Sequence, residues 1–268
     1  MQPRLWVHAH VIDAWTNILN YGEKLKSNST VNRYFFNTSM VRQFIFDKNI
    51  PLNERFDQFE SNIKDAMKKD KELLTFEKVH LVFLPVHQKN YFYIICINLE
   101  EPLFDVIDNR NSVAKFSGAY HDAPNELKIL FSRYLMRVNQ KSASTLEGVE
   151  PKGVSMNWCT RDNHVDYGVF CMHHMETYMR DKTVNWICGL PKESKQQQSV
   201  LNDLHIKYLT KILLSDANIY MSKIIAQTAK FAKKTNEEIK DFLNKGWKKG
   251  ERGYSTSRFG KRSVKLKT

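Results

Sequence analysis

Three apolar runs of strand length lie close together in the middle of the chain. They read VHLVFLPV at 79–86, YFYIICINL at 91–99 and LFDVID at 103–108. Their β-branched and aromatic residues favour extended backbone, and the stretches between them are short. We therefore predict that the three runs are central strands of one small sheet.

Helical patterns lie on both sides of these runs. Val11, Trp15 and Ile18 recur with the spacing of one helix face, and Pro124 follows Asp122 in a helix-start signal. The expected helices cover residues 9–20, 54–69, 126–138, 166–180 and 203–225. Helices, then a sheet, then helices predict an α+β fold.

The composition is that of a globular protein. Of the 268 residues, 42% are hydrophobic and 26% are charged. The longest apolar run, at 91–97, is far short of a membrane span, and residues 1–10 do not resemble a signal peptide. We therefore expect a soluble, monomeric protein of the nucleus or cytoplasm. Its four cysteines are too few and too scattered for a disulfide scaffold, so reduced thiols are expected.

The positive charge is concentrated at the C-terminus. Residues 223–268 hold 14 Lys and Arg against 4 Asp and Glu, which accounts for +10 of the net +12. We predict one folded domain over residues 1–222, followed by a basic helical or disordered tail over 223–268. Within 245–268, basic residues alternate with Trp247, Tyr254 and Phe259, a mixture that can contact phosphates and stack on bases. A solvated tail or a nuclear-import signal is the commoner explanation.

Three short motifs carry a resemblance to a known family. INL at 97–99, VID at 106–108 and DYGVF at 166–170 are similar to motifs of the ubiquitin-like-protein-specific (Ulp/sentrin) cysteine proteases, which process SUMO. Segments 33–36 and 207–218 are similar to those of plant and transposon-borne members. The resemblance implies a papain-like, Ulp-type α+β fold, in which a small mixed sheet is flanked by helices.

In this register the family's catalytic positions carry altered residues. Asp108 matches the triad aspartate, and Tyr91, seventeen residues earlier, stands at the histidine position. Tyr167 stands at the cysteine position, and Arg161 stands where the oxyanion glutamine belongs. Trp6 and Phe92 match two aromatic residues that form the substrate tunnel of the family; as an alternative, both are core aromatics.

Thiol proteolysis needs a thiolate, an imidazole that exchanges a proton, and donors to the oxyanion. A phenol with a pKa near 10 supplies neither the nucleophile nor the base at neutral pH. The resemblance therefore predicts a family member that has lost peptidase activity, a pseudoprotease. It can still bind a ubiquitin-like modifier such as SUMO, and it requires no cofactor.

Two alternatives for the chemistry remain. Cys171, one helical turn after Tyr167, is a candidate relocated nucleophile, although a buried structural cysteine is the more common case. His87 is expected in the loop before Tyr91, as an exposed polar residue. The histidines and cysteines between 159 and 174 match no common zinc spacing, so we predict no metal site.

Overall fold

We analysed a computed structural model of the protein. It describes residues 6–26, 31–88, 91–110, 122–179 and 186–241. The chain divides into two compact units, Met1–Ala217 and Asn218–Thr268. Helix α9 (Met221–Phe231) belongs to the second unit and has no buried residue. The basic segment 245–268 lies outside the described residues.

The first unit is built on a five-stranded mixed sheet with the strand order β1-β2-β3-β4-β5. The two central pairings are antiparallel, and the pairings of β1 with β2 and of β4 with β5 are parallel. The prediction that the three apolar runs are central strands is confirmed. The strands are β1 (Arg33–Phe35), β2 (Leu81–Gln88), β3 (Tyr91–Asn98), β4 (Leu103–Ile107) and β5 (Lys152–Gly153).

Strand β3 lies in the middle of the sheet and is buried along its whole length. Its register sets Ile95 opposite Leu84 of β2 and Val106 of β4. Helices cover both faces, so β3 is apolar without alternation, as expected for a strand buried on both sides.

The free edge of β1 is closed by a side chain of helix α1. The Asn20 amide donates to the Phe35 carbonyl oxygen at 2.8 Å and accepts from the Phe35 N–H at 2.9 Å. Glu23, one turn further along α1, accepts from the Arg33 N–H at 3.1 Å. Both backbone groups of Phe35 and the N–H of Arg33 are therefore paired with side chains at this edge.

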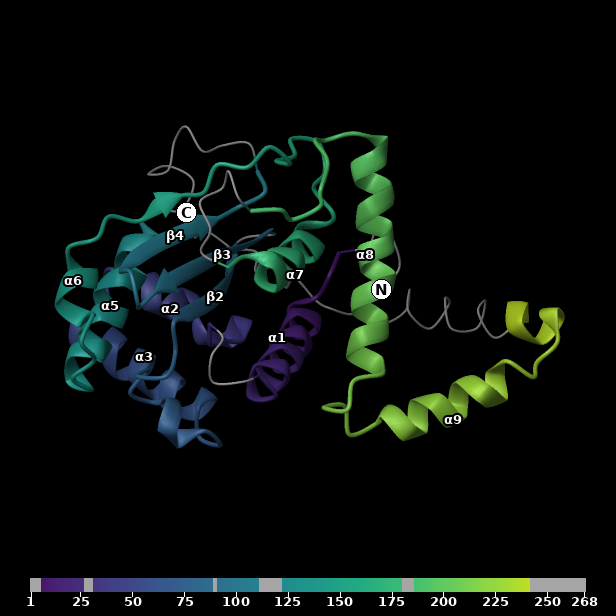
Figure 1. Cartoon of the computed structure of the whole chain (residues 1–268), viewed down its shortest axis with the longest axis horizontal. Coiled ribbons are helices and arrows are strands. Elements are labelled where there is room, and N and C mark those ends of the chain that lie inside the picture. Colours follow the sequence, from purple (N-terminus) through teal and green to yellow (C-terminus); the bar gives the residue numbers. More distant parts are fainter. Residues whose placement is uncertain (1–5, 27–30, 89–90, 111–121, 180–185, 242–268) are drawn as a thin grey trace, which may run out of the picture. The chain divides into compact units, whose positions relative to one another are not determined.

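Helices lie on both sides of the sheet. In Figure 1, α2, α3, α5 and α6 lie on one side of the strands, and α1, α7 and α8 lie on the other. Two short 3₁₀ helices, Thr38–Met40 and Lys71–Leu73, connect elements. Among the described residues of this unit, the α-helices are α1 (Ala9–Lys24), α2 (Gln43–Phe46), α3 (Leu52–Ala66), α5 (Ala123–Arg137), α6 (Ala143–Glu147), α7 (Tyr167–Thr177) and α8 (Lys195–Leu213).

The helix expected over residues 203–225 is two helices. Helix α8 ends at Leu213 and α9 begins at Met221. Between them, the Ser215 hydroxyl accepts from the Ala217 N–H at 3.2 Å, and the Asn218 side chain accepts from the Tyr220 N–H at 2.9 Å. Short polar side chains offer backbone groups an alternative to helical hydrogen bonds, which explains the break.

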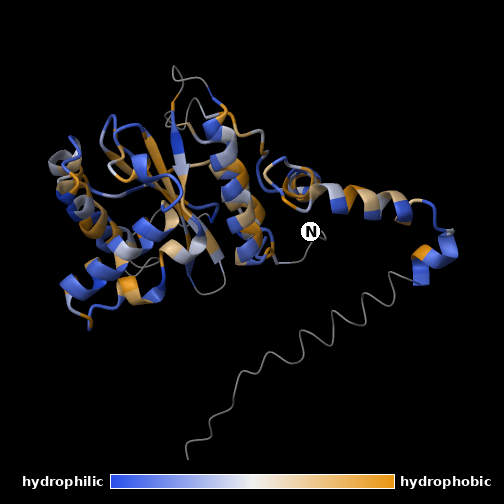
Figure 2. Ribbon diagram, turned by 90° about the horizontal axis from the view of Figure 1, so that it is seen from below, coloured by the Kyte–Doolittle hydropathy of each residue, from blue (hydrophilic) through white to orange (hydrophobic). Residues whose placement is uncertain are grey.

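Buried hydrophobic side chains of the sheet and of both helix groups form one core. In Figure 2 hydrophobic residues are concentrated on the strands and recur along the helices beside them. On the α3/α5 side the core is aromatic: the ring of Phe76 lies 5.3 Å from that of Phe131 and 6.0 Å from that of Tyr134. Edge-to-face ring pairs of this kind stabilise a core beyond their buried area. No helix within the described residues is long and apolar enough to cross a membrane.

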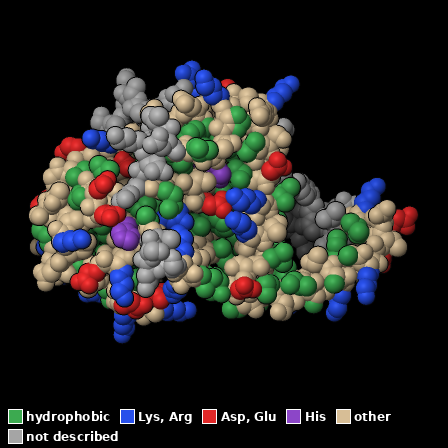
Figure 3. Space-filling model, in the orientation of Figure 1, with side chains coloured by type: hydrophobic (Ala, Val, Ile, Leu, Met, Phe, Trp, Pro, Cys, Tyr) green, Lys and Arg blue, Asp and Glu red, His purple; other side chains and the backbone are tan. Residues whose placement is uncertain are grey.

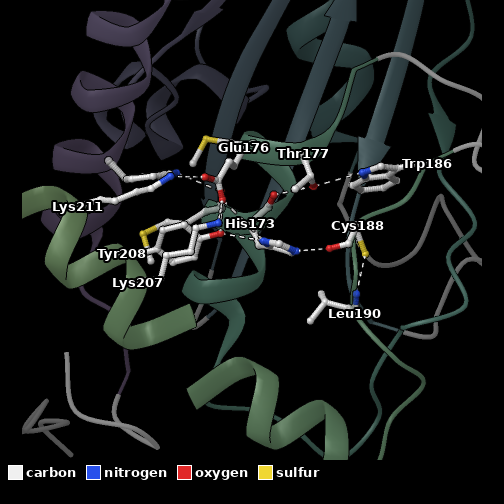
Figure 4. Close-up of polar contacts among 12 residues, drawn as sticks. His173, Glu176, Thr177, Trp186, Cys188, Leu190, Lys207, Tyr208 and Lys211 are labelled. Carbon is white, nitrogen blue, oxygen red and sulfur yellow. Dashed lines mark hydrogen bonds and ion pairs between the residues drawn. The ribbon is translucent and has the colours of Figure 1, made fainter. Parts of the chain in front are cut away.

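A polar network, buried at His173 and partly exposed at Glu176, joins α7 to α8 (Figure 4). His173 donates from Nε2 to the Cys188 carbonyl oxygen at 2.6 Å, and its Nδ1 lies 2.8 Å from the Tyr208 hydroxyl. Glu176 accepts from three side chains of α8: Lys207 at 2.6 Å, Lys211 at 2.8 Å and Tyr208 at 3.0 Å. These charge-assisted contacts fix the axis of α7, the helix that carries Tyr167.

Candidate functional site

The site lies at the N-terminus of α7, where Asp166 precedes the first helical residue. Its carboxylate accepts from Asn163 Nδ2 at 2.7 Å, His205 Nε2 at 2.8 Å and Gln198 Nε2 at 3.1 Å. Burial raises the pKa of Asp166, but these hydrogen bonds outweigh it and leave the pKa lowered. An ionised Asp166 thereby ties the preceding loop and α8 to the start of α7.

Gly168 allows the N-terminal segment to approach α7 closely. A Cβ at this position would lie 2.5 Å from Val7 Cβ, too close for any side chain. Val7 is buried, and the ring of neighbouring Trp6 lies 6.4 Å from that of Tyr167, edge to face. The glycine of the DYGVF motif therefore holds residues 6–8 against the site.

The structure brings together Tyr91, Asp108 and Tyr167. Tyr91 is the first residue of β3, and its ring lies 6.3 Å from that of Tyr167 at an interplanar angle of 68°. Asp108 directly follows β4 and is 5% exposed. Two neighbouring strands and the helix α7, which begins some sixty residues later, thus bring these residues together. Their assignment to catalytic positions stays a prediction.

Sequence reasoning missed the central residue of this cluster, Arg110. Its Nε lies 2.9 Å and its Nη2 2.5 Å from Asp108 Oδ2, and its backbone N–H donates to Asp108 Oδ1 at 2.9 Å. Its Cζ lies 3.6 Å from the centre of the Tyr91 ring. The only signal in the sequence was an arginine two residues after the triad-like aspartate, in DNR at 108–110.

Both phenols are held in the protonated form. Burial raises the pKa of Tyr167, and the charges of Asp108 and Tyr91 add to this against the opposing charge of Arg110. Burial likewise raises the pKa of Tyr91, although the charge and a hydrogen bond of Arg110 oppose it. The Tyr167 hydroxyl lies 3.0 Å from His164 Nδ1. At neutral pH neither phenol is a nucleophile or a general base.

Arg161 is exposed at the surface of the loop before α7. Its backbone N–H donates to the Glu193 carboxylate at 2.9 and 3.0 Å, and the Asp162 N–H donates to the same group at 2.9 Å. Glu193 therefore fixes the backbone of this loop. The assignment of Arg161 to the position of the oxyanion glutamine stays a prediction.

The two expected tunnel residues differ in accessibility. Trp6 is 54% exposed, whereas Phe92 is 5% exposed and its ring stacks on His87 at 4.4 Å. The expectation that His87 lies in a loop is wrong, because it belongs to β2 and pairs with Phe92 across the strands. His87 is exposed, as expected.

Cys171 is buried in the core side of α7, at 2% exposure. Burial, and to a smaller degree the charge of Asp13, raises the pKa of its thiol strongly, so the nucleophilic thiolate is suppressed. Within the described part of the chain, no group of three His, Cys, Asp or Glu side chains could hold a metal ion. His174 is buried, and its Nε2 accepts from Trp158 Nε1 at 3.1 Å.

Comparison with known proteins finds similarity in structure but not in sequence. No protein-family profile and no curated protein sequence matches the chain. The chain is similar to the C-terminal Ulp1 protease domain in complex with Smt3, the yeast ortholog of SUMO. That match has a TM-score of 0.52 and 13% identity, and it covers 81% of this chain and 80% of the other.

A second solved structure is the SUMO protease Ulp1 with its catalytic cysteine oxidised to a sulfinic acid. Here the TM-score is 0.50 at 16% identity, over 78% of this chain and 80% of the other. At such low identity the likeness concerns the fold alone. The chain therefore has the α+β fold of the Ulp1 SUMO protease catalytic domain.

Proposed function

We propose that this protein is a catalytically silent relative of the Ulp-type cysteine proteases. One observation carries the proposal: Arg110 pairs with Asp108 and covers the Tyr91 ring. In the family register Tyr91 stands at the histidine position, so the guanidinium lies where an active enzyme needs an imidazole next to its aspartate.

The chemistry of these groups supports loss of activity. A guanidinium stays protonated throughout the physiological range, so it cannot take up and return a proton as imidazole does. Tyr167 at the cysteine position offers a protonated phenol, and the thiol of Cys171 is buried one turn away. Asp108, which would orient a histidine, neutralises Arg110.

What remains open to a partner is the surface around Trp6. Its ring is exposed next to Tyr167, and the resemblance assigns this position to the channel for the modifier's C-terminal tail. Figure 3 shows basic and acidic side chains interspersed over the visible face. We propose that the protein binds a ubiquitin-like modifier of the SUMO type without cleaving it.

Cleavage and binding are tested separately. Wild-type protein is incubated with fluorogenic SUMO and ubiquitin substrates, and we expect rates equal to those of a heat-denatured sample. Cleavage above that background, abolished by Cys171→Ala, would overturn catalytic silence. Binding is measured by calorimetry with intact SUMO, where Trp6→Ala should weaken it about 10-fold or more, as for an exposed aromatic anchor. Lack of binding by the wild type would remove the modifier from the proposal.

A further inference from the structure

Arg110 is held as a bound ligand would be. Two of its guanidinium nitrogens lie against one carboxylate, that of Asp108, at 2.5 to 3.1 Å. The plane of the guanidinium group is close to the face of the Tyr91 ring, with Cζ 3.6 Å from the ring centre. A carboxylate that accepts two parallel N–H bonds, together with an aromatic ring that stacks on the cation, is suited to a planar guanidinium rather than to a compact ammonium ion.

The walls around this group come from separate parts of the fold. The carboxylate follows β4, Tyr91 opens β3 and Tyr167 opens α7. Tyr167 contacts Tyr91 edge to face at 6.3 Å and Trp6 edge to face at 6.4 Å. Such walls are positioned by the sheet and the helix, not by the conformation of the Arg110 side chain itself.

Burial makes the carboxylate depend on a cation. The Asp108 side chain is 5% exposed, and that of Arg110 is 23% exposed. A buried carboxylate that loses its cation keeps the cost of desolvation without the attraction that offsets it. Removal of the arginine side chain alone would therefore take a guanidinium partner away from a buried carboxylate and leave the walls of the pocket in place.

We propose that Asp108, Tyr91 and Tyr167 form a guanidinium-binding pocket, which the chain fills with its own Arg110. The ligand class is an arginine side chain or another alkylguanidinium. In the wild type the tethered Arg110 excludes such ligands, because its effective concentration is in the millimolar range or above. The pocket goes beyond the proposed function, since it would persist even if the protein proved to cleave a substrate.

The test is chemical rescue of Arg110→Ala. We expect this variant to melt about 5–10 °C below the wild type, because an ion pair with a buried partner is broken. Ethylguanidinium at millimolar concentration should raise the melting temperature of the variant in a saturable manner. Ethylammonium at equal concentration and ionic strength should raise it much less, and neither should raise that of the wild type.

Two further variants make the result specific. Asp108→Asn combined with Arg110→Ala removes the carboxylate, so ethylguanidinium should no longer stabilise the protein. Arg133→Ala is the matched control: Arg133 lies 4.5 Å above the Phe56 ring and has no ion pair within the described residues. This variant should not respond to ethylguanidinium.

Three results would overturn the proposal. They are the absence of a saturable response in Arg110→Ala, an equal response in either of the other two variants, and an equal response to ethylammonium. If Arg110→Ala is unfolded at room temperature, recovery of its far-ultraviolet circular dichroism on adding ethylguanidinium becomes the readout. Failure to recover would then count against the pocket.

Discussion

At the scale of single residues, the pairing of Asp108 with Arg110 governs what any restoration of the catalytic residues can achieve. The Asp108 carboxylate, which the proposed register assigns to the orientation of a histidine, already accepts three hydrogen bonds from the Arg110 side chain. A histidine introduced at position 91 would compete with a permanently charged neighbour two residues from its aspartate. Under the proposed register, we therefore expect that replacing Tyr91 and Tyr167 alone is insufficient.

We predict that Tyr91→His with Tyr167→Cys stays inactive, and that adding Arg110→Ala yields measurable cleavage of a SUMO-derived fluorogenic substrate. The expected gain from the third change is on the order of 10²-fold, the usual contribution of a correctly placed general base. Adding Arg133→Ala to the same double variant is the control and should give no gain. Equal rates for the double and triple variants would contradict the prediction.

A second prediction concerns His174, which is fully buried and accepts from Trp158. Burial, and then the charge of His173, hold the pKa of His174 well below its ordinary value of 6.5. As the pH falls below 6.5, the unfolded chain binds a proton at this position that the folded chain does not bind. His174 therefore costs no stability above pH 6.5, and the free energy of unfolding decreases as the pH falls below that value. The limiting slope is about 1.4 kcal/mol per pH unit.

His174→Gln keeps an acceptor for Trp158 and removes the titration. The free energy of unfolding, measured in urea at several pH values from 7.5 to 5, should fall less steeply with decreasing pH in this variant. His164→Gln, at the part-buried edge of the site, serves as the comparison. A wild-type slope in His174→Gln would show that His174 does not carry the acid sensitivity.

At the scale of elements, the start of α7 depends on close packing against the segment before α1. Gly168 meets Val7 at a distance that no other residue could occupy, and the same contact places Trp6 beside Tyr167. Interiors of this density transmit a local expansion to their neighbours. A side chain at position 168 should therefore displace residues 6–8 while α7 remains folded.

We predict that Gly168→Ala lowers the free energy of unfolding by about 1–3 kcal/mol, the usual cost of overpacking. Trp6 should also become more accessible to a fluorescence quencher. Gly22→Ala is the matched control, because Gly22 lies within α1 and an added Cβ would meet nothing within 4 Å. It should stabilise the protein by about 0.5–1 kcal/mol. Destabilisation by both changes to the same degree would refute this account of Gly168.

At the scale of the whole molecule, the sequence predicts the central sheet well and its edges poorly. Strands β2, β3 and β4 carry long apolar runs, and their pairing fixes where Tyr91 and Asp108 emerge. The edge strands β1 and β5 have three and two residues, which is too short for any periodic signal. They form because the neighbouring strands offer free hydrogen-bonding groups.

The candidate site, like the sheet, could be predicted from the sequence only in part. The family resemblance, through the register of its motifs, leads us to expect Tyr91, Asp108 and Tyr167 at one site; spacing alone would not place them together. The direction of the Arg110 side chain depends on a turn in which its own N–H binds Asp108 Oδ1, and no periodicity encodes such a turn. The stacking of His87 on Phe92 was missed because the strand extends two residues past its apolar run.

The division of the chain at Ala217 gives a prediction at this scale. Residues 1–217 contain the complete sheet and the helices on both of its sides, so we expect them to fold without the remainder. Urea unfolding of a protein truncated after Ala217 should be a single cooperative transition with the midpoint of the full chain. A broad transition, or a markedly lower midpoint, would show that the compact unit needs residues beyond 217.

The bond pair between Asn20 and Phe35 also has a consequence for self-association. An unpaired strand at the rim of a sheet can recruit an extended peptide or nucleate fibrils. Here the Asn20 amide takes the place of a neighbouring strand at Phe35 and occupies both of its outward backbone groups. Replacing it with alanine should leave the enclosed core intact, yet turn this rim into a seed for oligomer growth.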